Sequence, residues 1–75
     1  MGFDGRTVTA GNAADIAHWC GGKLVEEEDA LDPTKKYAGI NVPCGTEVRR
    51  ASEGDTVITD GTRFHVVKKG AKFND

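Results

Sequence analysis

Long apolar runs are missing from this 75-residue sequence, and no stretch approaches the roughly 20 residues that a membrane-spanning helix needs. The first residues also lack the charged and then apolar segments of a secretory signal. An excess of positive charge is absent too, since the formal net charge is −2. Neutralising phosphates supplies most of the affinity of nucleic-acid binders, so nucleic-acid binding is not expected. We expect a soluble protein that stays where it is made.

Patterns that carry catalytic or metal chemistry are also scarce. The side chains that could bind a metal are the two histidines and two cysteines, His18, Cys20, Cys44 and His65. None of them forms a C-x2-C or H-x3-H pair. His18 and Cys20 would point roughly 200° apart on a helix. No glycine-rich phosphate loop or nucleophile elbow is present. The sequence predicts no metal, no cofactor and no enzyme. The two thiols are expected to be free, with a disulfide between them as the alternative, and Cys44, in a predicted turn, is expected to be the more exposed.

The short chain allows one domain, 1–75, with a thin core. A chain of this size buries only about 60% of its unfolded surface. Domains this small often add a disulfide, a metal or a partner subunit. A homo-oligomer is therefore one of the expected alternatives.

One short helix is predicted by the spacing of apolar residues. Asn12 is a suitable N-cap, and Asp15 three residues later could return a capping-box bond. Glycines at 21–22 end the helix, because glycine adopts the left-handed C′ conformation without steric cost. Trp19 borders the apolar face and is either a core anchor or, if exposed, a binding surface. The face at i, i+3, i+4 and i+7 consists of Ala13, Ile16, Ala17 and Cys20.

Strands are predicted on both sides of this helix. Alternation and β-favouring residues place them at 6–9, 23–27, 37–42, 47–51, 56–59 and 63–68. Asp60 and Gly61 predict a type I′ hairpin between the last two. The fold class is α+β: β-α-β followed by a meander of about four strands, with the helix on a small, mostly antiparallel sheet. The tail at 70–75 is predicted to be flexible unless Phe73 folds back as an anchor.

A polar segment at 26–36 is predicted to be the main loop and the most mobile part of the chain. Its acidic end is either a solvated loop or a negative face for a basic partner. The acidic residues are Glu26, Glu27, Glu28 and Asp29.

Basic residues in the second half come from strands that are expected to be neighbours. On an antiparallel ribbon some of them would share a face. They either protect a sheet edge from aggregation or form an anion or nucleotide site. These residues are Arg49, Arg50, Arg63, Lys68 and Lys69.

Four segments together resemble a family of small uncharacterised proteins of phages and prophages, especially of actinobacteria. They are the helix end Trp-Cys-Gly-Gly at 19–22, Val-Pro at 42–43, Ala-Ser-Glu-Gly-Asp at 51–55 and Gly-Thr-Arg-Phe at 61–64. The family favours proline where Glu53 stands and tryptophan where Thr56 stands. The resemblance implies phage origin and an accessory role, and it assigns no functional residue.

Three functions are consistent with these observations. The first is a non-enzymatic phage accessory protein that binds a host protein in the cytoplasm of the infected bacterium. The second is an oligomer that sequesters a small molecule or nucleotide, with Arg49, Arg50 or Arg63 lining a pocket at a subunit boundary. The third is a minor virion component.

Overall fold

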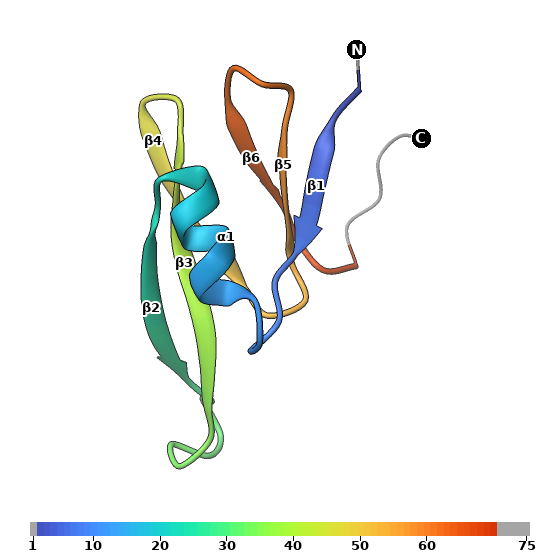
Figure 1. Cartoon of the computed structure of the whole chain (residues 1–75). Coiled ribbons are helices and arrows are strands. Elements are labelled where there is room, and N and C mark those ends of the chain that lie inside the picture. The colour runs from blue at the N-terminus through green and yellow to red at the C-terminus, as the bar shows by residue number, and fades with distance from the viewer. Residues whose placement is uncertain (1, 71–75) are drawn as a thin grey trace.

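The computed structural model describes residues 2–70. Within them it has one helix and two three-stranded antiparallel sheets, so the predicted α+β class is confirmed (Figure 1). One sheet has the order β1-β5-β6 and the other the order β2-β3-β4. The elements are β1 (Asp4–Thr7), α1 (Ala13–Cys20), β2 (Lys23–Glu28), β3 (Lys36–Cys44), β4 (Glu47–Ser52), β5 (Thr56–Thr59) and β6 (Phe64–Val67).

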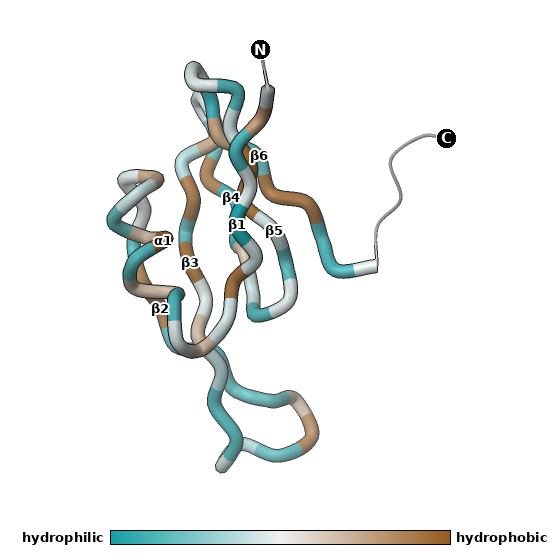
Figure 2. Tube along the Cα trace, turned by 45° about the vertical axis from the view of Figure 1, so that its right-hand side comes forward, coloured by the Kyte–Doolittle hydropathy of each residue, from teal (hydrophilic) through white to brown (hydrophobic). Residues whose placement is uncertain are grey.

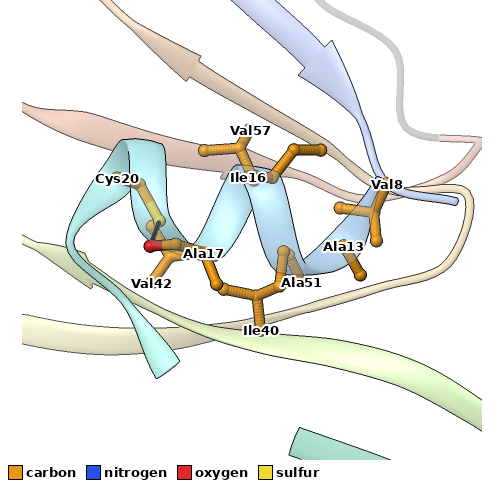
Figure 3. Close-up of a cluster of buried hydrophobic side chains, with 9 residues drawn as sticks. All are labelled: Val8, Ala13, Ile16, Ala17, Cys20, Ile40, Val42, Ala51 and Val57. Carbon is orange, nitrogen blue, oxygen red and sulfur yellow. Dashed lines mark hydrogen bonds between the residues drawn. The ribbon is translucent and has the colours of Figure 1, made fainter. Parts of the chain in front are cut away.

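The core lies between the helix and the inner faces of both sheets. All four predicted helix residues are buried, and they pack with Val8 and with strand residues from β3, β4 and β5. Figure 3 shows Val57 on one side of the helix residues and Ile40, Val42 and Ala51 on the other. The full cluster is Val8, Ala13, Ile16, Ala17, Cys20, Ile40, Val42, Ala51 and Val57.

The helix begins and ends where the sequence predicts, but its N-terminal cap differs. Asn12 makes no side-chain bond to the first turn, so the predicted capping box with Asp15 is not formed. The Asn12 amide turns back instead, accepting the N–H of Thr9 at 2.7 Å and donating to the carbonyl of Thr7 at 2.9 Å. This side chain therefore fixes the turn between β1 and α1.

The two glycines after the helix have different tasks. Gly21 takes the left-handed conformation with φ +70°, and a Cβ there would meet nothing within 4 Å. A Cβ on Gly22 would overlap the backbone carbonyl oxygen of Asn41 and lie 3.2 Å from Ile40. Gly22 therefore lets the helix end pack directly on β3.

Replacing Gly22 with alanine is expected to destabilise the fold more than the same change at Gly21. Overpacking against a backbone atom costs about 2 kcal/mol, whereas alanine in the left-handed conformation costs about 1 kcal/mol. Urea unfolding of both variants checks this. Equal losses would mean that the helix end is not in contact with β3.

The strands are divided between two sheets rather than forming a single meander. Strands β3 and β4 pair, and β5 and β6 pair, but β4 and β5 belong to different sheets. The turn between β4 and β5 bonds to the segment after β1: the N–H of Val8 donates to Asp55 O at 2.8 Å, and the N–H of Gly54 donates to Val8 O at 2.9 Å. These bonds direct β5 toward β1, with which it pairs in antiparallel register.

Three other local predictions are corrected. Pro43 and Cys44 continue β3 instead of breaking it, and the turn follows at 45–46. Strand β1 covers Asp4–Thr7 instead of the predicted 6–9, and Val8 lies buried just beyond it. The β5–β6 connection has four residues, 60–63, and is not a two-residue type I′ turn, because Thr59 pairs with Phe64. Phe73 and the tail lie, apart from Gly70, outside the described residues.

Candidate functional site

The acidic run lies largely in a strand, which corrects the prediction of a loop over 26–36. Strand β2 extends through Glu28, β3 begins at Lys36, and the loop is confined to 29–35. The strand alternation separates the glutamates, because successive side chains point to opposite faces. Glu26 pairs with Lys36 at 3.5 Å. The three glutamates therefore do not form one continuous negative face.

Glu27 is bound on the outer face of the β2-β3-β4 sheet. Its carboxylate accepts from the Arg50 guanidinium at 3.0 Å and from the Ser52 hydroxyl at 3.1 Å. The same guanidinium donates to Asn41 Oδ1 at 2.7 Å. This group therefore links all three strands of the sheet across one face.

The β2–β3 hairpin extends beyond the body of the molecule as an arm, and the 29–35 loop forms its tip (Figure 1). Figure 2 shows the tip as largely hydrophilic with one hydrophobic stretch. Within it, Leu31 is 95% exposed, the highest value among the exposed large apolar side chains. An apolar side chain in this position contributes nothing to the core.

Hydrogen bonds inside the loop hold this leucine in place. Asp29 accepts the N–H of Leu31 at 2.8 Å and the hydroxyl of Tyr37 at 3.2 Å. Asp32 accepts both the N–H and the hydroxyl of Thr34, at 3.1 and 2.6 Å. Backbone bonds from Asp29 to Lys35 and from Lys35 to Asp32 close the loop. The loop is therefore ordered by its own hydrogen bonds.

These bonds also keep the tip negatively charged. The N–H of Leu31 lowers the pKa of Asp29, and the Thr34 hydroxyl lowers the pKa of Asp32. Between 28 and 35 the sequence has three carboxylates against one lysine. Leu31 is thus an apolar group flanked by ionised aspartates.

An open groove lies between the arm and the segment that precedes the helix. It has a volume of about 520 Å³, and its lining includes Ala10, Leu24, Ala38 and the Glu26–Lys36 pair. Leu24 is 49% exposed there. The inner side of the arm is therefore an accessible and partly apolar surface.

The predicted basic cluster does not gather into one patch. Arg49 and Arg50 are consecutive in β4 and point to opposite faces. Arg49 pairs with Glu47 at 3.0 Å, and Lys68 pairs with Asp55 at 3.3 Å. Arg63 lies at the β5–β6 loop, near Gly45. Since Arg50 is bound to Glu27, three of these cations are matched by acids, which removes the main support for a nucleotide pocket at Arg49, Arg50 or Arg63.

An aromatic and cationic cluster that was not predicted from the sequence links β1, α1 and β6. The Arg6 guanidinium carbon lies 4.1 Å from the centroid of the Trp19 ring. Trp19 meets Phe64 edge to face, with ring centroids 5.1 Å apart. Trp19 is thus partly buried against the core and partly covered by arginine, which favours the core-anchor interpretation.

The two thiols and two histidines are the potential metal ligands identified in the sequence. Burial raises the pKa of the Cys20 thiol and of the Cys44 thiol, so both are protonated at neutral pH. Among residues 2–70, no group of three potential metal ligands comes together. The two cysteines are free, as predicted.

Comparison with known proteins gives no relatives: no family model, curated protein or solved structure matches this chain. None of the helices in the described part of the chain is long and apolar enough to cross a membrane.

Proposed function

We propose that this chain is a non-enzymatic phage accessory protein that binds a host protein in the cytoplasm of the infected bacterium. The observation that carries the proposal is the projecting β2–β3 hairpin, whose internally bonded tip presents Leu31 at 95% exposure. The resemblance of the segments at 19–22, 42–43, 51–55 and 61–64 to small phage proteins supports the phage origin.

Binding through a preshaped tip is favourable for a small protein. A flexible loop would lose conformational freedom on binding, and this loss reduces affinity. The bonds of Asp29 and Asp32 order the loop in advance. Burying a leucine side chain contributes about 1.5–3 kcal/mol, so Leu31 acts as the anchor and the aspartates favour a basic rim around the partner's pocket.

Replacing Leu31 with serine is expected to weaken host-protein binding by about 10- to 100-fold. This factor corresponds to the free energy that burial of a leucine side chain contributes. Stability should be unchanged, because this side chain packs against nothing in the fold. The measurement is affinity capture from host lysate, followed by titration of the captured protein with wild-type and L31S chains.

Val48→Ser is the matched control. Val48 is also an exposed apolar residue, at 67%, but it lies in β4 away from the tip. Equal capture by wild type and L31S, or equal loss in L31S and V48S, would contradict the assignment of the hairpin tip.

A further inference from the structure

Strand β1 has an outer edge to which no other strand of residues 2–70 is paired. It pairs with β5 on one side and lies at the outside of its sheet (Figure 1). Both backbone groups of Val8 are directed to the 54–55 turn. Backbone groups of successive strand residues point in opposite directions. Those of Gly5 and Thr7 therefore point to the open edge, where the Thr7 carbonyl accepts from Asn12.

The charges on this edge strand are self-complementary. Asp4 and Arg6 flank Gly5 and lie on the same face of the strand. When two copies of β1 pair antiparallel about a two-fold axis at Gly5, Asp4 of each copy stands opposite Arg6 of the other. The Gly5 N–H and carbonyl groups of the two copies can then exchange hydrogen bonds at the centre. Opposite charges in directly facing positions stabilise an antiparallel pair.

Both charged groups are available for this contact. Within the described chain neither Asp4 nor Arg6 forms an ion pair, although both are exposed. The Trp19 ring holds the Arg6 guanidinium at 4.1 Å. An arginine fixed by stacking loses less freedom when it binds a carboxylate than a free one does.

The open edge of β2 is unsuitable for the same purpose. It carries three consecutive glutamates, Glu26, Glu27 and Glu28. Self-pairing there would bring like charges near one another, which is destabilising and is a common protection of sheet edges. Docking of Leu31 from a second copy into the groove along the arm is unfavourable for the same reason. It would bring the acidic tip close to Glu26 and Glu53, which line that groove.

We propose that the protein forms a two-fold homodimer through antiparallel pairing of β1 with β1 of a second copy, centred on Gly5. The two β1-β5-β6 sheets then join into one six-stranded sheet. This contact is separate from the hairpin tip, so it can be tested independently of the proposed host binding. It also adds backbone pairing and two ion pairs to a chain whose own core is small.

Charge reversal tests the proposal. Sedimentation equilibrium over a concentration series should give twice the 8.0 kDa chain mass for the wild type. D4R and R6D should each weaken dimerisation about tenfold or more, because each places like charges opposite one another twice. The double variant D4R/R6D should restore the dimer, and a mixture of D4R with R6D should form a heterodimer.

Controls separate this contact from general charge effects and from misfolding. D15R and R63D change the net charge by the same amounts elsewhere on the surface and should dimerise like the wild type. D4R leaves the Arg6–Trp19 stack in place. If circular dichroism shows that R6D is unfolded, the D4R variant alone tests the dimer contact. A monomeric wild type, or a D4R chain that dimerises as well as D15R, would overturn the proposal.

Discussion

Replacing Ile40 with alanine is expected to remove most of the stability of this protein. Ile40 is fully buried and lies under the helix, in contact with the cluster from both sheets (Figure 3). Truncating a buried isoleucine costs about 2–5 kcal/mol. The free energy of unfolding of a 75-residue chain is on the order of 4–11 kcal/mol, at about 0.05–0.15 kcal/mol per residue. The change should therefore bring the chain close to its unfolding threshold.

Urea unfolding followed by circular dichroism measures this loss, and Val48→Ala provides the control. Val48 lies in β4 and is exposed, so its truncation should change the free energy of unfolding by less than about 0.5 kcal/mol. A similar small effect for I40A would mean that the core between the sheets is not packed as described.

Replacing Asp55 with alanine is expected to have the second largest effect, about 3 kcal/mol. Asp55 is 5% exposed, and its carboxylate accepts the N–H of Ser52 at 2.9 Å, the N–H of Lys69 at 2.7 Å and the Lys68 ammonium at 3.3 Å. Hydrogen bonds to a charged group contribute about 1.5–3 kcal/mol each. In the alanine variant these three donors would also lose their acceptor. This carboxylate joins the β4–β5 turn to the end of β6.

Asp60→Ala is the matched control for Asp55. Asp60 also accepts two backbone N–H groups, from Thr62 and Arg63, but its turn is exposed and water can replace the lost acceptor. D60A should therefore lose about 1 kcal/mol or less. Equal losses of unfolding free energy in D55A and D60A would show that the burial of Asp55 does not increase its contribution to stability.

The same carboxylate should make stability depend on pH. Burial raises the pKa of Asp55, but the bonds from Ser52, Lys69 and Lys68 outweigh it and lower the pKa below its ordinary 3.8. A carboxyl with a lowered folded-state pKa stabilises the fold above its unfolded pKa, and this stabilisation is lost as pH falls toward the folded-state pKa. Below about pH 5 the free energy of unfolding should fall less steeply in D55A than in the wild type.

The helix and most of the strands could be predicted because their signals are local. The four buried helix residues recur with the helical period, and Ala38, Ile40 and Val42 alternate as one face of a strand. The end of β2 could not be predicted in this way, because the expected strand at 23–27 overlapped the expected loop at 26–36, whereas β2 extends through Glu28. Its polar residues lie in a hairpin arm outside the core, so pairing with β3 maintains the strand without burial.

The division into two sheets depends on bonds between distant residues. Val8 bonds with Gly54 and Asp55, and no local pattern reveals that contact. The sequence marked Asp55 only as the end of the Ala-Ser-Glu-Gly-Asp segment at 51–55, although it is the one buried polar residue of the described chain.

The candidate site shows the same limit. The acidic run lies in the same hairpin as the candidate site, but Leu31 has no periodic neighbours and its exposure depends on where the arm projects. The Arg6–Trp19 contact joins β1 to the helix end and needs the tertiary structure. An isolated leucine between two aspartates was the one signal that could have been used.

The pairing of β1 with β5 has a consequence for how the chain acquires its structure. Asp4 is opposite Thr59, and Thr7 is opposite Thr56, so the first strand pairs with a segment that follows the helix and three other strands. Contacts between residues far apart in sequence slow folding, because a long loop must close before they are made. We expect the β2-β3-β4 meander to form early and the β1–β5 pairing to be rate-limiting. During synthesis the β1-β5-β6 sheet therefore cannot be completed until residues 56–67 have left the ribosome, after the β2-β3-β4 segments have emerged.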